Sequence, residues 1–301
     1  MELLDPRVDF VFKRIFGSEN NKDVLMHFLN RVFAEAGEPP LTEIILMNPY
    51  TDKDAPQDKQ SIFDIYAKTA SGKLIDIEMQ LFNKYQMEKR TLFYWSKRYA
   101  TQLEEGDDYQ KLNKCVTINI LNYSFLPNDE YHNVFHLRED RTGISLCDDI
   151  EVHFLELPKL ADTPPTHEGL ANWLLFLKSE DTSNWEVLKM NEPGLGKAME
   201  TLRFLSQDSE ARLMYEARQK YLHDEASFFA KIKAMSEEAA KGMEFGLAKG
   251  REEGIAEGRD EGKEAAKREI ARELLEMNLE IERIAKATGL TEAEIRKLKE
   301  N

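Results

Sequence analysis

The pattern of apolar and polar residues divides the first part of the chain into helical and extended segments. Apolar side chains at three- and four-residue spacing predict two amphipathic helices. Between them, two runs alternate in residue type as half-buried strands do, and Ala70-Ser71-Gly72 joins them as a hairpin turn. The predicted elements are a helix at 21–36, strands at 43–47, 61–69 and 73–81, a helix at 85–103 and a strand at 115–121.

Beyond residue 125 the pattern changes twice, first to helices and then to a glycine-rich tail. Two more apolar runs predict strands, and helical spacing then continues to about residue 222, with a break at Pro193-Gly194. The additional strands are expected at 131–137 and 150–157. We therefore expect three regions: an α/β core with additional strands at 1–160, a helical acidic region at 161–240, and a glycine-repeat helix with a small helix-turn-helix-like tail at 241–301.

Glycine recurs at every fourth position from Gly242 to Gly262. Six glycines inside a helix would cost about 5–6 kcal/mol relative to alanine, so a flexible linker is one interpretation of this segment. However, the intervening residues form helices well, and a period of four keeps the glycines on one slowly drifting stripe. A second helix can approach such a stripe closely. We favour this interpretation and predict a homo-oligomer formed through the Gly242–Gly262 helix.

The end of the chain has the outline of a helix-turn-helix. Gly289 lies between two short helical segments, and Thr291 with Glu294 forms a capping box for the second segment. This last helix presents few basic residues, so we expect it to pack against the chain or bind a partner rather than to read DNA.

The chain has 301 residues and a formal net charge of −15. Its three successive segments carry −3 for residues 1–125, −10 for 126–240 and −2 for 241–301, so the acidity belongs mainly to the middle. This balance is atypical of a passive nucleic-acid coat, but it leaves room for an enzyme that touches nucleic acid locally. No apolar run approaches the ~18 residues of a membrane span, and the N-terminus does not resemble a signal peptide. With two cysteines, which fit a reducing compartment, we expect a cytoplasmic protein with no membrane partner.

The candidate chemistry lies on the predicted hairpin. With Ser71 at the centre of the turn, Asp64 lies opposite Glu78, because both are equally distant from Ser71 in the sequence. Side chains alternate faces along a strand, so Asp76 and Gln80 share a face with this pair. One face therefore gathers three carboxylates and an amide, while the other builds a core. The predicted core face consists of Phe63, Ile65, Ala67, Ile75, Ile77 and Met79.

Metal binding is one interpretation of this polar face. Like charges opposed across a hairpin destabilise a sheet, and a divalent cation would remove that penalty. Carboxylate oxygens suit Mg²⁺ or Mn²⁺, which are completed by water and by substrate phosphate. The alternative is a half-solvated strand with a polar outer face, which the alternation alone favours. A one-residue slip in register would also separate the carboxylates.

Other candidate sites lack the necessary pattern. His132 and His136 lie four residues apart in a predicted strand, where that spacing does not make a ligand pair, so we predict no zinc site from them. Cys115 lies inside an apolar strand and is expected to be a small core residue.

Several sequence blocks that occur in a fixed order along the chain, the hairpin among them, support the metal-site interpretation. The blocks are DPRVDFVFKRIFG from Asp5 to Gly17, the helix KDVLMHFLNRVF, the hairpin DIYAKTASGKLIDIEMQ and the segment RTLFYWSKRYATQLEEGDDYQKLNKCVTINIL. Together they resemble the recombination-promoting nuclease/transposase family of the PD-(D/E)XK nuclease superfamily. The resemblance covers residues 1–125 closely, and the glycine-rich tail followed by IERIAKATGLTEAEIRKL is similar to the ending of that family. The implied fold is α/β, a PD-(D/E)XK (restriction-endonuclease-like) core of helix, three strands, helix and strand, with added C-terminal helices.

The resemblance implies a DNA endonuclease that depends on Mg²⁺ or Mn²⁺ and acts in recombination, transposition or defence. Carried over by position, Asp64 and Glu78 are metal ligands, assisted by the backbone carbonyl of Met79. Gln80 occupies the position of the superfamily's lysine, which orients the attacking water and stabilises developing charge. Glutamine supplies no cation, although it can hydrogen-bond a water. A non-catalytic DNA- or protein-binding dimer on a nuclease scaffold is the alternative, which Gln80 and the net acidity favour slightly and the two carboxylates oppose.

Three further residues are candidates near this site. Lys13 belongs to the family's opening block and Arg90 to its helix after the motif, and each could contact a phosphate or a carboxylate. Equally, Lys13 could cap a helix end and Arg90 could form a surface salt bridge. Asp76 is an additional candidate ligand, although the polar-outward norm favours a solvated neighbour. The basic residues expected to track DNA along the second helix are Lys84, Lys89, Lys97 and Arg98.

Overall fold

The computed structural model describes residues 2–48, 64–83, 86–178 and 182–300. Two compact units divide the chain, Met1–Ala226 and Ser227–Asn301. Within the described ranges, no helix combines the length and the hydropathy of a membrane-spanning segment.

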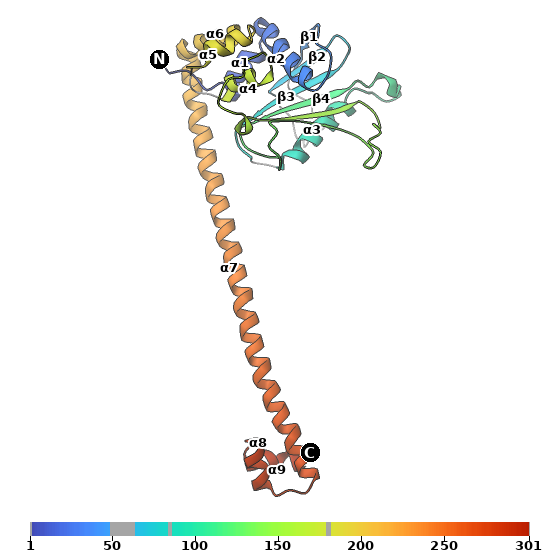
Figure 1. The fold of residues 1–301 in the computed structure, drawn as a ribbon, viewed down its shortest axis with the longest axis vertical. Helices are drawn as coiled ribbons and strands as arrows, with labels where there is room; N and C mark the ends of the chain where they lie inside the picture. Colours follow the sequence, from blue (N-terminus) through green and yellow to red (C-terminus); the bar gives the residue numbers. More distant parts are fainter. Residues whose placement is uncertain (1, 49–63, 84–85, 179–181, 301) are drawn as a thin grey trace. The chain divides into compact units, whose positions relative to one another are not determined.

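A six-stranded sheet forms the centre of the first unit (Figure 1). Its strands are β1 (Ile44–Leu46), β2 (Ile65–Thr69), β3 (Leu74–Gln80), β4 (Cys115–Leu121), β5 (His132–His136) and β6 (Ile150–Glu156). They lie in the order β1-β2-β3-β4-β6-β5, in which β3, β4 and β6 run parallel while β1, β2 and β5 pair antiparallel with their neighbours. The predicted order of helix, three strands, helix and strand is confirmed, since α2 (Lys22–Glu35) precedes β1 and α3 (Met87–Ala100) separates β3 from β4.

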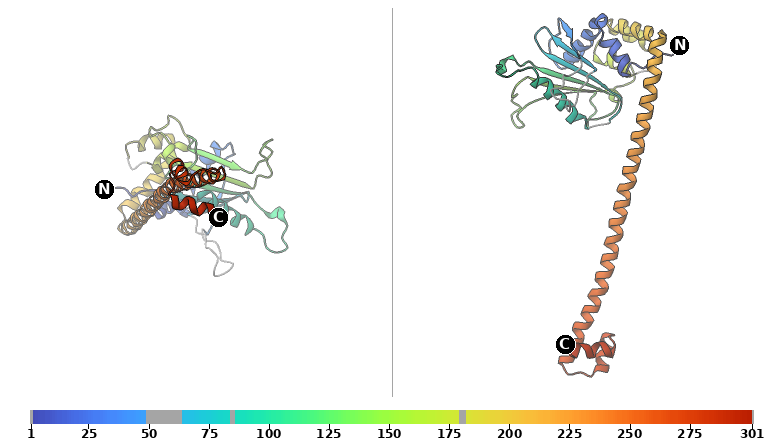
Figure 2. Two further views of the ribbon diagram at one scale, coloured as in Figure 1. Left: turned by 90° about the horizontal axis from the view of Figure 1, so that it is seen from below. Right: turned by 180° about the vertical axis from the view of Figure 1, so that it is seen from behind.

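Helices cover both faces of this sheet, as the views in Figures 1 and 2 show. One face builds the main core, in which Phe16, Phe28 and Trp173 pack with ring centroids 5.5–6.1 Å apart. The other face is covered by α3, whose Trp95 and Tyr99 pack against Cys115, a buried residue as predicted. The helices on the core side are α1 (Asp9–Phe16), α2, α4 (Leu170–Lys178), α5 (Trp185–Asn191) and α6 (Leu195–Gln207).

The predicted register of the hairpin is confirmed. Ile65 pairs with Ile77 across β2 and β3, so Asp64, which directly precedes β2, lies opposite Glu78. Phe63 of the predicted core face lies outside the described residues. The other predicted members of that face are buried in the main core: Ile65, Ala67, Ile75, Ile77 and Met79.

Gly72 closes the hairpin turn in the left-handed region, with φ +92°. Its amide donates a hydrogen bond to the carbonyl of Thr69 at 3.0 Å. A Cβ at this position would also lie 2.3 Å from Oδ1 of Asn113. Both the backbone conformation and the close neighbour therefore require glycine, which holds the two strands in register.

The second unit contains the C-terminal part of α7 (Ser209–Glu276) together with α8 (Ile281–Thr288) and α9 (Glu292–Glu300). The helical interpretation of the glycine repeat is confirmed, because the whole repeat lies inside α7. The predicted capping box also forms, since the Thr291 amide donates to Glu294 Oε2 at 2.8 Å and the Glu294 amide donates to Thr291 Oγ1 at 3.3 Å. A small buried core joins these helices: Ala271, Ile284, Leu290 and Ile295.

Candidate functional site

Three carboxylates gather on the face of the sheet that α3 covers. Asp76 and Glu78 of β3 are only 5% and 3% exposed. Asp64 joins them from the start of β2, and its side chain is 13% exposed. On the adjacent strand β4, Thr117 pairs with Asp76 and Asn119 with Glu78, and both of these polar side chains are buried. The structure therefore brings the predicted carboxylates together in a site shielded from water.

The prediction that Asp76 is a solvated neighbour is wrong. β3 is a central strand whose polar face lies under α3, so alternation along the strand does not bring Asp76 to solvent. Among the described residues, neither oxygen of Asp76 nor Oε1 of Glu78 has a hydrogen-bond partner. Buried carboxylate oxygens without donors are costly, and hard oxygen ligands are what Mg²⁺ and Mn²⁺ require. The residues present therefore fit a divalent cation.

Asp64 is held from two sides. The Met79 amide donates to Asp64 Oδ2 at 2.9 Å, and Lys13 Nζ lies 3.3 Å from Asp64 Oδ1. Lys13 belongs to the last turn of α1, which ends at Phe16 and is capped by Gly17. A Cβ at Gly17 would lie 3.2 Å from Cγ1 of Ile65, so glycine lets the end of α1 approach the start of β2 closely. The structure thus places the Lys13 ammonium beside a carboxylate of the site.

Glu78, Gln80 and Arg90 form a closed set of hydrogen bonds. Gln80 Nε2 donates to Glu78 Oε2 at 2.9 Å, and one Arg90 nitrogen donates to the same oxygen at 2.8 Å. The other terminal nitrogen of Arg90 donates to Gln80 Oε1 at 3.0 Å. The Arg90 side chain is 21% exposed, and its guanidinium lies 5.1 Å from the ring centroid of Tyr94. Arg90 therefore pairs with a buried carboxylate of the site rather than with a surface partner.

The other basic residues predicted along this helix differ in position. Lys84 lies outside the described residues. Lys89 is exposed and Lys97 is half-buried. The Arg98 guanidinium lies over the Tyr66 ring, 4.0 Å from its centroid. The exposed basic surface of α3 is therefore smaller than the sequence suggests.

Burial raises the pKa of all three carboxyl groups. The pKa of Glu78 is raised to about 8 by burial and by the charge of Asp64, against the opposing charge of Arg90. The pKa of Asp76 is raised well above its ordinary value by burial and by Glu78, and burial also raises the pKa of Asp64. At neutral pH the metal-free site therefore retains protons, which a bound cation would displace.

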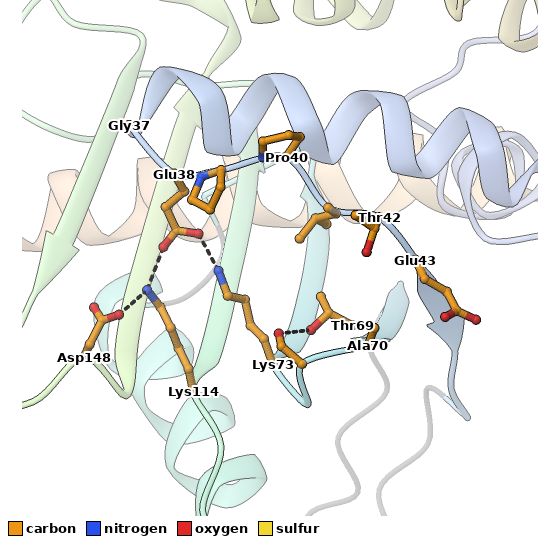
Figure 3. Close-up of a pocket in the computed structure, with 13 residues that line it drawn as sticks. Gly37, Glu38, Pro40, Thr42, Glu43, Thr69, Ala70, Lys73, Lys114 and Asp148 are labelled. Carbon is orange, nitrogen blue, oxygen red and sulfur yellow. Dashed lines mark hydrogen bonds and ion pairs between the residues drawn. The ribbon is translucent and has the colours of Figure 1, made fainter.

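A second group of potential ligands lies at the opposite end of β4 and β6, and sequence reasoning missed it. His136 Nδ1 lies 3.9 Å from both Asp148 Oδ1 and Glu151 Oε2, and these three residues could hold an ion. The ammonium of Lys114 already pairs with them, at 3.0 Å from Asp148 Oδ2 and 2.5 Å from Glu151 Oε2. Figure 3 shows Lys114 also bound to Glu38 beside a pocket of about 660 Å³. Because a lysine neutralises these carboxylates, the group fits a cation less well than the Asp64 and Glu78 site.

The order of elements is consistent with a PD-(D/E)XK nuclease core. Residues 6–231 match the family model described as PD-(D/E)XK nuclease family transposase, and the chain belongs to this family. Residues 264–300 match the Rpn/YhgA-like nuclease family, C-terminal HTH domain, which confirms the predicted helix-turn-helix outline. A search of curated proteins and a search of solved structures gave no match.

Proposed function

We propose that this protein is a DNA endonuclease that hydrolyses phosphodiester bonds with Mg²⁺ or Mn²⁺ and acts in recombination, transposition or defence. The observation that carries the proposal is the buried carboxylate cluster on a PD-(D/E)XK core, where three carboxylate oxygens have no partner among the described residues. The helix-turn-helix match at 264–300 supports DNA as the partner, since this motif is a DNA-binding module.

In this proposal Asp64 and Glu78 hold the ion, assisted by the Met79 backbone carbonyl, and the buried Asp76 is an additional ligand. Gln80 orients the attacking water through its amide. When bound, the ion would lower the pKa of a water and stabilise negative charge on the phosphate. Lys13, whose ammonium lies 3.3 Å from Asp64, adds positive charge for the DNA phosphate.

The chain itself prepares the ligand geometry. The Met79 amide fixes Asp64 Oδ2. Gln80 and Arg90 together occupy Glu78 Oε2, which leaves Oε1 for the ion. Ligands oriented in this way by neighbouring hydrogen bonds lose little freedom when the ion binds.

Cleavage of supercoiled plasmid tests the proposal. The full chain is incubated with Mg²⁺, with Mn²⁺ or with EDTA, alongside Asp64→Asn and Glu78→Gln. Each substitution is expected to lower the cleavage rate by about 100-fold or more, because a carboxylate ligand is lost. Glu88→Gln removes an exposed carboxylate from α3 and is the matched control.

The outcomes separate the candidate functions. Equal cleavage by all the variants would overturn the assignment of the site. Absence of cleavage by the unaltered chain with either ion would overturn the nuclease and favour a non-catalytic DNA- or protein-binding dimer on the same scaffold. Cleavage that survives EDTA would overturn the metal requirement alone.

We also propose that two copies of the chain pair along α7. Ile232 and Met235 of this helix are 46% and 70% exposed. With Ala239, Gly242 and the next glycine they continue a spacing of three and four residues, which is the seam of a coiled coil. A Cβ built at any glycine from 242 to 262 meets no atom within 4 Å, so the space beside the stripe is open to a second helix. Close packing there would offset the cost of about 1 kcal/mol per helical glycine.

Light scattering of the full chain tests this pairing. A dimer mass is expected, and Met235→Glu is expected to give a monomer because it places a charge in the seam. Met277→Glu makes the same chemical change at a residue that is 71% exposed just beyond α7, and it should leave the dimer intact. A monomer mass for the unaltered chain, or equal masses for both variants, would reject the pairing.

A further inference from the structure

The position that carries lysine in many PD-(D/E)XK enzymes is Gln80 here, so the site lacks a cation on β3. The structure supplies a cation from another element. Arg90, one turn into α3, donates to Glu78 Oε2 at 2.8 Å and to Gln80 Oε1 at 3.0 Å. A positive charge therefore lies within hydrogen-bonding distance of both functional positions of the motif.

The hydrogen bonds also determine how the Gln80 amide is turned. A guanidinium has only donors, and Glu78 Oε2 already accepts from Arg90, so the amide oxygen must face Arg90 and its nitrogen must face Glu78. Arg90 thus donates to both Gln80 and Glu78, and Gln80 donates to Glu78. Without the guanidinium, the amide of Gln80 would lose the donor that fixes this orientation.

Packing of α3 holds the guanidinium in place. Thr91 Oγ1 donates to Asn119 Oδ1 at 3.3 Å and so ties the first turns of α3 to β4. Met87, at the start of the helix, is buried against Leu121. The arginine itself lies over the ring of Tyr94. A cation on a fixed helix can act as reliably as one on the strand, because its supporting contacts are already made.

We propose that Arg90 is the positioning residue that replaces the missing lysine: it fixes Gln80 and Glu78 and supplies the positive charge that the strand no longer provides. This inference rests on the proposed nuclease function. It also explains how glutamine serves at this position, since the amide and the guanidinium together provide the orientation and the charge that one lysine side chain would combine.

Relocation of the charge tests the proposal. Arg90→Gln should lower plasmid cleavage by about 100- to 1,000-fold, as for loss of one charge-stabilising donor in an active site. Arg90→Lys keeps the charge without the planar fork and should retain intermediate activity. The double variant Arg90→Gln/Gln80→Lys returns a cation to β3 and should recover at least about tenfold over Arg90→Gln. Lys111→Gln removes a cation paired with Asp107 on an exposed turn and is the control.

Calorimetric titration with Mn²⁺ provides a readout other than cleavage. Since Glu78 Oε1 is not bound by Arg90 and Gln80 still donates to Oε2, the affinity of Arg90→Gln for Mn²⁺ should fall by no more than about tenfold. Loss of Mn²⁺ binding in Arg90→Gln would overturn the proposal, because Arg90 would then act by retaining the ion.

Cleavage by Arg90→Gln at the rate of the unaltered chain would also overturn the proposal. So would a double variant no more active than Arg90→Gln, which would make Arg90 a structural residue only. If the unaltered chain itself does not cleave, the nuclease function fails first and this inference fails with it. If the unaltered chain cleaves and relocation does not restore activity, only the role of Arg90 fails.

Discussion

Replacement of Glu78 with glutamine should remove much of the pH dependence of stability in the metal-free protein. The pKa of Glu78 is raised from 4.5 to about 8 in the folded chain, first by burial and then by the charge of Asp64. In the folded chain, Glu78 keeps its proton at pH values where it is already ionised in the unfolded chain. Low pH therefore favours the folded state. This contribution is fully present below the unfolded pKa of about 4.5 and is lost as the pH rises through about 8.

The magnitude follows from the two pKa values of Glu78. They differ by roughly 3.5, and at 1.36 kcal/mol per pKa unit the full contribution is about 5 kcal/mol. Because the unfolded chain has begun to titrate at pH 5, about 4 kcal/mol of this falls between pH 5 and pH 9. Solvent screens little of it, since Glu78 is 3% exposed. Between pH 5 and pH 9, the unfolding free energy of Glu78→Gln should therefore fall by up to about 4 kcal/mol less than that of the unaltered chain.

Urea unfolding in EDTA at a series of pH values measures the effect. Tryptophan fluorescence reports on the first unit, because all three tryptophans of the chain lie there. Glu88→Gln should keep the slope of the unaltered chain, since that carboxylate is exposed. Mn²⁺ added near pH 8 should stabilise the unaltered chain more than Glu78→Gln. Parallel pH profiles for the unaltered chain and Glu78→Gln would refute the reasoning.

The remaining predictions concern stability and use the same unfolding assay. Lys114→Met should cost about 3–5 kcal/mol, because it removes the cation paired with Glu151 Oε2 and leaves this carboxylate, 1% exposed, with only His153 beside its other oxygen. Adding Glu151→Gln to that variant should recover part of the loss, and no recovery would contradict the pairing. Gly72→Ala should cost about 1–3 kcal/mol, because it combines positive φ with a clash at Asn113, whereas an unchanged unfolding midpoint would contradict this account. Asp76→Val should stabilise the metal-free chain by about 1–3 kcal/mol, since it removes buried oxygens that have no partner among the described residues, and destabilisation would argue against that reading.

The hairpin register could be predicted from sequence because two rules agree there. Side chains alternate with a period of two, and Ser71-Gly72 supplies a turn that few other residues allow. Together they place Asp64 opposite Glu78, as the pairing of β2 with β3 shows. A strongly periodic segment with a defined turn therefore specifies its own local geometry.

Contacts between distant elements were not accessible in this way. Lys13 reaches Asp64 because α1 ends against the start of β2, and Arg90 reaches Gln80 because α3 packs over that face of the sheet. Neither distance is encoded in a local pattern. The burial of Asp76 was missed for the same reason, since alternation predicts which face a residue shares but not what covers that face. The network in which His132 Nε2 lies 2.9 Å from His153 Nδ1 likewise depends on the pairing of β5 with β6.

The alternation along β3 has a consequence for the stability of the fold. Ile75, Ile77 and Met79 of this strand belong to the main core, while its acidic residues contribute nothing to that core. Replacement of these acidic residues by apolar ones should therefore leave the core packing intact, and it can even raise the stability of the metal-free fold. The presence of Asp76 and Glu78 on β3 is therefore not explained by the stability of the fold.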